Sequence, residues 1–270
     1  LSLHDALPIY YMNNMNLIDT HTHLYVEAFD KDQKNVIEFA DENNINRFYI
    51  PSIDSSYTKR MHKLKTTYPD KVHLMAGLHP TSVDGNYENE LVHVRDRLEK
   101  EKPCAVGEIG MDLYWEQKYQ SQQEDAFRRQ IRLAKKHQLP IVIHCRAAFD
   151  EVFKVLEQEN DEALYGIFHC FTGNQAQAEQ AIHLGFYLGI GGVVTFKNAG
   201  LDKVIQNIDP QHIVLETDSP YLSPSPKRGK RNETGYLIYI AQKLADIWQL
   251  PIEEVADITT KNALQVFKHG

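Results

Sequence analysis

Eight short apolar segments recur along the chain, and the stretches between them carry a helical pattern. The segments predict strands over 16–20, 46–50, 72–76, 103–107, 140–144, 165–169, 185–190 and 212–216. Their starts lie 20 to 37 residues apart, which leaves room for one helix and two loops each time. Strands that are apolar throughout are covered on both faces, as in parallel sheets. We therefore predict an α/β fold of the TIM-type (β/α)8 barrel, with a doubly wound open sheet as the alternative that strand count alone does not exclude.

The stretches between the strands repeat with the period of an α-helix. The period is clear at four apolar positions: Phe149, Val152, Phe153 and Leu156. It recurs between Leu237 and Trp248, and Asn174 predicts the start of a further helix that ends before Gly185. No linker-like composition interrupts residues 15–270, which we predict to be a single hydrolase-type barrel domain. Residues 1–14 lack a basic segment and contain Pro8, so they do not resemble a secretion signal, and we predict a non-native or disordered leader.

Composition excludes several classes of protein. No apolar run approaches the roughly 18 residues that a membrane span needs. Three cysteines without a CxxC pair argue against a disulfide scaffold or a zinc finger. The formal net charge is −8, whereas a protein that coats nucleic acid with its whole surface is normally basic. If nucleic acid is the substrate, the basic residues must therefore be concentrated locally.

Histidines and carboxylates stand at or just past the ends of six predicted strands. They are His21, His23, His79, Glu108, His144, His169 and Asp218. The active sites of (β/α)8 barrels lie at the carboxyl ends of the strands, so these side chains should ring one face. In the His21-x-His23 pair both side chains point the same way and can bind one ion. Imidazole together with carboxylate favours zinc, manganese, iron or nickel.

Six of these residues, His79 apart, are too many for one tetrahedral zinc ion. They suit two ions about 3.5–4 Å apart that share a carboxylate and a hydroxide. Such a pair favours hydrolysis of a phosphodiester or an amide. No GxSxG or Walker motif competes, and the glycines of 189–192 lack the spacing of a nucleotide-binding loop. We predict His79 to lie behind the ligands or to contact the substrate.

Basic and aromatic residues near the predicted strand ends are candidate substrate contacts. Four bases follow Asp218 closely: Lys227, Arg228, Lys230 and Arg231. Further candidates for binding phosphate are Arg146 and Lys197, and Tyr114 and Trp115 could stack on a base. For the basic run the alternative is an ordinary solvated loop, and for the two aromatic residues it is core packing.

Seven motifs occur in order along the chain: DTHTHL, GLHP, GEIGMD, HCRAA, FHCF, ETDSPYL and RGKRNE. With these motifs the chain resembles the TatD family of metal-dependent hydrolases, among the amidohydrolase-like barrels, over residues 16–268. The resemblance implies a TIM-type barrel and a cytoplasmic location. It also implies a divalent-metal-dependent deoxyribonuclease, which in this family is often a 3′→5′ exonuclease on single strands.

The same resemblance assigns roles to the ligands. His21, His23 and Asp218 would hold one metal, His144 and His169 would hold the other, and Glu108 would bridge them. Glu108 and Asp218 are thus the candidate catalytic residues, and the cofactors would be two divalent ions (Mg, Mn or Zn). Two positions depart from the family pattern: Lys227 replaces a histidine and Thr234 replaces a proline.

The expected partner is DNA, as single strands or ends, with no membrane and no stable protein partner. One alternative is the same barrel acting on another bond, such as an aminoacyl-tRNA ester or a small amide. A second alternative is a non-catalytic binding protein with a relic site, against which the complete ligand set argues.

Overall fold

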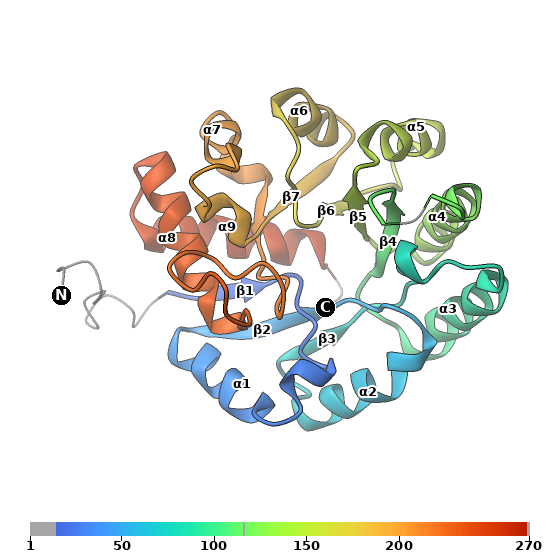
Figure 1. Cartoon of the computed structure of the whole chain (residues 1–270), viewed down its shortest axis with the longest axis horizontal. Coiled ribbons are helices and arrows are strands. Elements are labelled where there is room, and N and C mark those ends of the chain that lie inside the picture. Colours follow the sequence, from blue (N-terminus) through green and yellow to red (C-terminus); the bar gives the residue numbers. More distant parts are fainter. Residues whose placement is uncertain (1–14, 116, 269–270) are drawn as a thin grey trace.

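Eight parallel strands lie at the centre of the computed structural model, which describes residues 15–115 and 117–268. They are β1 (Leu17–Asp19), β2 (Ile45–Ile50), β3 (Val72–Leu74), β4 (Val106–Asp112), β5 (Ile141–Arg146), β6 (Gly166–Phe168), β7 (Phe186–Ile190) and β8 (Ile213–Leu215). The strands pair in chain order as a three-stranded and a five-stranded sheet. Parallel bridges join the two sheets at both seams, Ala76 with Val106 and Thr22 with Ser219. The fold is therefore the predicted (β/α)8 barrel and not the doubly wound alternative (Figure 1). The predicted leader, residues 1–14, lies outside the described residues.

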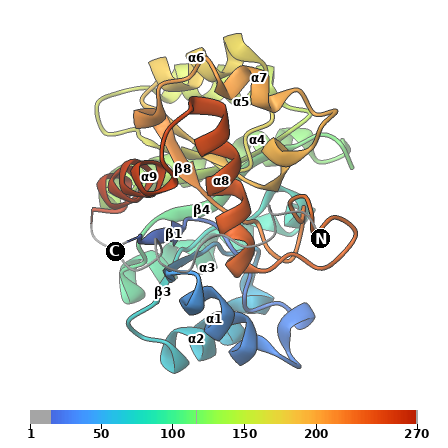
Figure 2. The ribbon, with the colours of Figure 1, turned by 90° about the vertical axis from the view of Figure 1, so that its left-hand side faces the viewer.

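The helices surround the strands, as Figures 1 and 2 show from two directions. They are α1 (Gln33–Glu42), α2 (Thr58–Thr67), α3 (Tyr87–Glu101), α4 (Gln120–His137), α5 (Phe149–Glu159), α6 (Gln175–His183), α7 (Leu201–Ile205), α8 (Leu237–Trp248) and α9 (Ile252–Val266). The helical periods predicted at α5 and α8 are confirmed, and Asn174 caps α6 through reciprocal hydrogen bonds with Gln177. None of the described helices combines the length and apolar character that a membrane-spanning helix requires.

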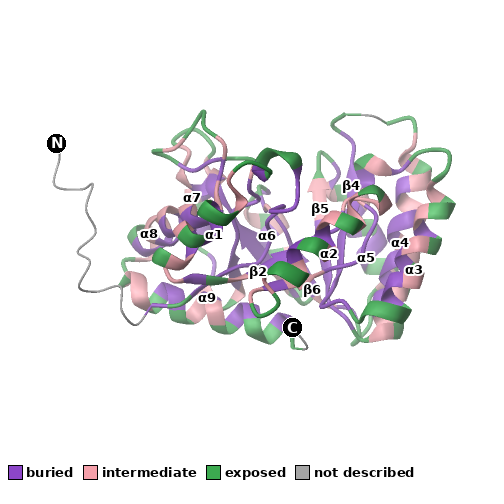
Figure 3. Cartoon of the chain, turned by 90° about the horizontal axis from the view of Figure 1, so that it is seen from below, coloured by how far each residue is buried: buried purple, intermediate pink, exposed green. Residues whose placement is uncertain are grey.

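Two apolar layers hold the barrel together. A large cluster lies between the strands and the helices, where Figure 3 shows the buried residues. The smaller inner cluster draws one residue from each of seven strand regions: Ile18, Tyr49, Met75, Ala105, Val142, Ile167 and Val214. Phe267, just after α9, stacks on Tyr49 with ring centroids 3.8 Å apart. This stack fills the amino-terminal end of the barrel interior with apolar side chains.

Strand β4 differs from its prediction over 103–107. It begins at Val106 and continues to Asp112, so Glu108 lies inside the strand and not after it. The apolar run ends at Gly107, but the backbone ladder with β5 continues to the pair of Asp112 with Arg146. At Gly110 a side chain would overlap the backbone carbonyl of His144, which explains a glycine within this strand. The ladder thus holds Asp112 opposite Arg146, while Glu108 lies at an irregularity between Gly107 and Ile109, where its N–H donates to the Ser52 carbonyl at 3.2 Å.

Candidate metal centre

The alternation of side chains along the strands places the histidines in the barrel mouth. On β5, Val142 belongs to the inner layer, and His144 follows it two residues later on the same face. Beside β6, His169 follows Ile167 in the same way. Each imidazole therefore lies one layer above the inner apolar cluster, toward the carboxyl end of the barrel.

The loops after β1 and β8 are bonded to each other, which positions Asp218. The Thr217 hydroxyl donates to Asp19 Oδ2 at 2.6 Å, and the Asp218 N–H donates to the His21 carbonyl at 2.9 Å. Asp218 has φ of +54°, an uncommon left-handed conformation for a residue other than glycine. Strained backbone of this kind clusters at functional sites. Its carboxylate Oδ1 lies 3.5 Å from His23 Nε2.

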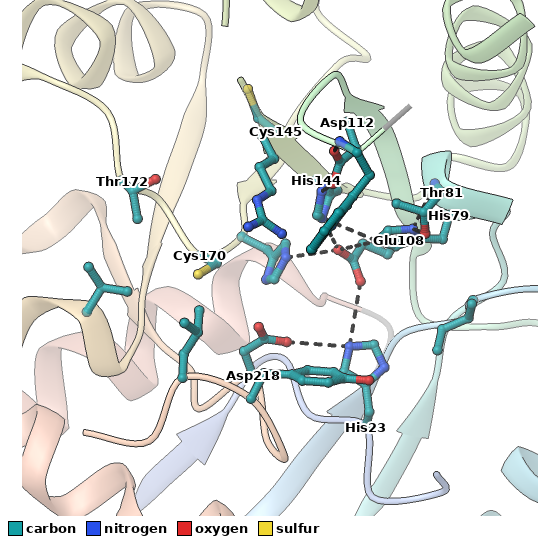
Figure 4. Close-up of a pocket in the computed structure, with 17 residues that line it drawn as sticks. His23, His79, Thr81, Glu108, Asp112, His144, Cys145, Cys170, Thr172 and Asp218 are labelled. Carbon is teal, nitrogen blue, oxygen red and sulfur yellow. Dashed lines mark hydrogen bonds and ion pairs between the residues drawn. The ribbon is translucent and has the colours of Figure 1, made fainter. Parts of the chain in front are cut away.

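The Glu108 carboxylate stands between two groups of histidines, one at each oxygen. Figure 4 shows it with His23 on one side and with His79 and His144 on the other. At Oε2 the neighbours are His21 Nε2 at 3.1 Å and His23 Nε2 at 3.7 Å. At Oε1 they are His144 Nδ1 at 2.7 Å, His169 Nε2 at 2.9 Å and His79 Nε2 at 3.2 Å. The carboxylate is therefore the point where the two groups meet.

Charge and burial oppose each other throughout this cluster. Burial alone would raise the pKa of the Glu108 carboxyl, but His169, His79 and His21 outweigh it and hold that pKa well below its usual value. Burial would lower the pKa of His169, yet Glu108 and Glu216 outweigh it and hold that pKa well above its usual value. Burial and the neighbouring His169 lower the pKa of His21. The cluster therefore favours positive charge, and its carboxylates favour the protonated form of His169.

The chemistry of the donors fits divalent metal ions. Ring nitrogens and carboxylate oxygens about 3 Å apart repel through their lone pairs unless a proton or a metal ion lies between them. His21, His23 and Glu108 form one group whose ligand atoms lie within 4.8 Å of one another. His79, Glu108 and His144 form a second, and His21, His169 and Glu216 form a third. All six residues predicted as ligands are thus brought to one place. His79 also lies among the donors, closer to Glu108 than a residue behind the ligands would be.

Metal uptake should release protons near neutral pH. A ligating imidazole must give up its proton, and the raised pKa of His169 keeps that proton bound to higher pH. Affinity should therefore weaken as the pH falls, by about tenfold per pH unit for one displaced proton. Calorimetric titration of the metal-free protein with Mn²⁺, in buffers of different ionisation enthalpy, measures the number of protons. Zero protons released at pH 7 would contradict this electrostatic picture.

The cluster forms the floor of a cavity of about 720 Å³. Trp115, from the loop after β4, and Arg146, at the end of β5, line one part of it, and Tyr221 and Leu222, from the loop after β8, line another. Trp115 is 70% exposed and Tyr221 is 51% exposed. Exposed large aromatic side chains of this kind are a feature of interaction sites. The cavity is therefore polar and charged at its base and aromatic at its rim.

The residues predicted to contact substrate lie in different places. Arg146 and His79 line the cavity, whereas Tyr114 lies beneath the Arg146 guanidinium, 4.0 Å from ring centroid to Cζ, and is not among the lining residues. Arg228 packs over the ring of Phe196 at 3.8 Å, next to the exposed Lys197 in the chain. Lys230 is exposed. These three basic residues lie outside the cavity lining.

Arg231 has a structural role within the basic run. Its guanidinium donates two hydrogen bonds to Asp32, at 2.8 and 2.7 Å, and one to Glu233 at 3.0 Å. Lys227, where the family pattern has histidine, lies over the rings of Tyr236 and Tyr239. Lys227, Arg228 and Lys230 are therefore the members of the run for which the structure gives no acidic partner among the described residues, and Arg228 and Lys230 are the exposed ones among them.

Sequence reasoning assigned no role to two carboxylates of the site. Asp112 Oδ2 lies 2.9 Å from His144 Nε2, and Glu216 Oε1 lies 3.2 Å from His169 Nδ1. The signal was present in the spacing. Glu216 stands just after β8 and two residues before Asp218, and Asp112 stands on β4 four residues after Glu108.

Comparison with known proteins gives a consistent result. The family model described as TatD related DNase matches residues 18–268. The uncharacterized metal-dependent hydrolase YabD of Bacillus subtilis is 39% identical over 253 residues, which cover 93% of this chain and 99% of that protein. The crystal structure of YjjV, a TatD homologue from Escherichia coli, has a TM-score of 0.88 at 26% identity and covers 94% of this chain and 98% of that one. A TatD family hydrolase from Entamoeba histolytica shares the fold, with a TM-score of 0.80 at 21% identity over 93% of this chain and 98% of that one.

Proposed function

Because this chain belongs to the TatD related DNase family of metal-dependent hydrolases, we propose that it hydrolyses phosphodiester bonds in DNA. The proposed activity is that of a 3′→5′ exonuclease on single-stranded or damaged DNA ends. The observation that carries the proposal is the Glu108 carboxylate, held between two donor groups at the floor of an open cavity. This arrangement suits a pair of divalent ions acting on a charged ester.

In the proposed mechanism, His21, His23 and Asp218 would hold one divalent ion and His144 and His169 the other, with Glu108 between them. Bound ions would supply a more acidic water and would neutralise charge on the phosphoryl group. Burial would raise the pKa of Asp218, but the hydrogen bond from His23 and the charge of His169 keep it below its usual value. Asp218 is therefore ionised at neutral pH, and its carboxylate, which lines the cavity, can accept the proton of the attacking water.

The cavity rim supports a nucleic-acid strand as the substrate. An exposed indole such as Trp115 offers a face on which any base can stack, and the Arg146 guanidinium beside it can bind a phosphate with two hydrogen bonds. Outside the cavity, Arg228 and Lys197 extend positive charge along the loops after β8 and β7. A protein of net charge −8 thus carries local cations next to its site.

Trp115→Ala should weaken binding of single-stranded DNA by roughly tenfold, because stacking contributes about 1–3 kcal/mol per base. Trp115→Phe should retain most of the affinity, since it keeps a stacking face. Fluorescence anisotropy with a labelled oligonucleotide, in an Asp218→Asn parent that does not cleave, measures the effect. Leu264→Ala, at an exposed apolar side chain on α9, is the control. Equal affinities for the Trp115→Ala and Leu264→Ala variants would exclude base stacking at this position.

Replacing Arg228 and Lys230 together by alanine should flatten the dependence of log K on log salt by roughly 1.4, because each phosphate contact on a single strand contributes about 0.7. Affinity should fall similarly for every sequence, since backbone contacts carry no base information. Metal content should not change, because neither residue is a ligand. The control is the double variant Lys100→Ala, Lys136→Ala at the carboxyl ends of α3 and α4. If the salt dependence of the Arg228, Lys230 variant equals that of the control, the basic run is a solvated loop that does not contact phosphates.

The proposed activity is tested by presenting competing substrates to one preparation. Single-stranded DNA labelled at its 3′ or 5′ end, RNA and aminoacyl-tRNA are each incubated with Mn²⁺ or Mg²⁺. We expect release of mononucleotides from the 3′ end of DNA, and no activity in the Asp218→Asn variant, which excludes a contaminating nuclease. Faster hydrolysis of the aminoacyl ester than of DNA would favour the alternative barrel hydrolase. If none of these substrates is hydrolysed, the assignment to the family of metal-dependent hydrolases still stands, but the nuclease proposal is wrong.

A further inference from the structure

Glu216 is a buried carboxylate that lies beside His169 but is not one of the six predicted ligands. Its side chain is fully buried, and Oε1 accepts the Cys170 N–H at 2.8 Å and faces His169 Nδ1 at 3.2 Å. Oε2 is also buried and has no hydrogen-bond partner among the described residues. A buried carboxylate with one unbonded oxygen is costly, so its retention calls for a role other than stability.

His169 is held from both sides. Its Nε2 points to Glu108 Oε1 at 2.9 Å, while its Nδ1 points to Glu216. Its ring stacks on that of His21, with centroids 3.7 Å apart and an interplanar angle of 13°. A carboxylate that accepts the Nδ1–H bond leaves the lone pair on Nε2, which is the tautomer a metal ion needs at that position.

Gly189 makes the space for this carboxylate. It lies on β7, and a Cβ at this position would overlap Glu216 Oε2 and approach His169 Cα at 3.2 Å. At the neighbouring Gly191 a Cβ would meet only ordinary contacts, with Glu216 Oε1 at 3.6 Å and Cγ at 3.7 Å. Within the glycine-rich stretch 189–192, Gly189 therefore makes room for the Glu216 side chain, whereas Gly192 makes room for the backbone carbonyl of Leu222.

We propose that Glu216 is a positioning residue that orients His169 toward the metal centre, with Gly189 as the position that admits it. In this role Glu216 acts through His169 and is not itself a metal ligand, although its carboxylate lies within 4.8 Å of donor atoms of His21 and His169. The inference depends on metal binding by the centre but not on which substrate the enzyme hydrolyses, so failure of the nuclease proposal would leave it intact.

The first test is Glu216→Gln, which keeps the shape of the side chain but replaces an acceptor oxygen by an amide that can present a donor to Nδ1. We expect the affinity for Zn²⁺, measured by competition with a chromogenic chelator, to fall by about 10- to 100-fold. In the zinc-loaded protein, the slowly exchanging Nδ1–H proton of His169 should be visible by NMR in the wild type. It should shift or disappear in Glu216→Gln, with His169→Asn providing the assignment.

The second test uses the two glycines as a matched pair. Gly189→Ala should lower zinc affinity in the same way as Glu216→Gln, because the new methyl group displaces the carboxylate. Gly191→Ala should bind zinc within about twofold of the wild type, since its methyl group meets only van der Waals contacts. Circular dichroism shows whether each variant is folded. If Gly189→Ala does not fold, Glu216→Gln with its NMR signal carries the test.

Two results would overturn the proposal. One is wild-type zinc affinity in Glu216→Gln together with an unchanged Nδ1–H signal, which would show that His169 is held without Glu216. The other is an equal loss of affinity in Gly189→Ala and Gly191→Ala, which would point to strand packing and not to the carboxylate.

Discussion

Glu108→Gln should abolish hydrolysis while the fold stays intact. The carboxylate is the contact shared by both donor groups, with Oε2 3.1 Å from His21 and Oε1 2.7 Å from His144. An amide carries no charge and offers one acceptor oxygen in place of two, so it bridges two cations poorly. Losing about 4 kcal/mol of transition-state stabilisation corresponds to roughly 10³-fold in rate. Turnover, metal content by elemental analysis, and circular dichroism are measured on the same preparation.

Glu101→Gln is the matched control for this variant. Glu101 also pairs with a histidine, His62, at 2.9 Å, but at the surface near the end of α3 and away from the cluster. It should keep wild-type turnover and metal content. Wild-type turnover of Glu108→Gln at saturating metal would instead show that the bridging assignment is wrong.

The protein should bind two divalent ions per chain, and removing them with a chelator should abolish hydrolysis completely. The two ions should also be separable by mutation, because the donors divide between the two oxygens of Glu108. His23 lies 3.7 Å from Oε2, so His23→Ala should lose the ion on that side, while His144→Ala should lose the ion beside Oε1. Each variant should then bind one equivalent, with activity reduced by at least about 100-fold.

The comparison for these variants is His62→Ala, which removes an exposed imidazole outside the cluster and should still bind two ions. Titration of the metal-free protein with Mn²⁺, followed by activity at each step, gives the number of ions required. Full activity at one equivalent in the wild type would remove the two-ion mechanism. If the His23 and His144 variants each lost both ions, the donors would act as one undivided site.

The barrel, and the gathering of the candidate ligands at one end of it, could be predicted because each depends on local patterns. Apolar runs with helical stretches between them require parallel strands covered on both faces, and such strands end on one side. His21, His144 and His169 stand at those ends, so the topology brings them together whatever the exact packing. Strand β4 was the exception, because glycine at 107 and 110 resembles a loop in sequence although the ladder with β5 continues through it.

Tertiary structure alone decided how the ligands are grouped and what supports them. Which oxygen of Glu108 faces which histidine depends on the positions of five imidazoles from four strand ends, and no sequence spacing encodes these positions. The same holds for Arg231, which looks free in the sequence but is bonded to Asp32, 199 residues away. It also holds for Gly189, whose missing side chain matters only because Glu216, just after the next strand, occupies the space. Sequence patterns thus determine which residues reach the barrel mouth, because backbone periodicity is local. Contacts between strands determine what those residues do there, because steric fit and charge pairing depend on neighbours that are distant in the chain.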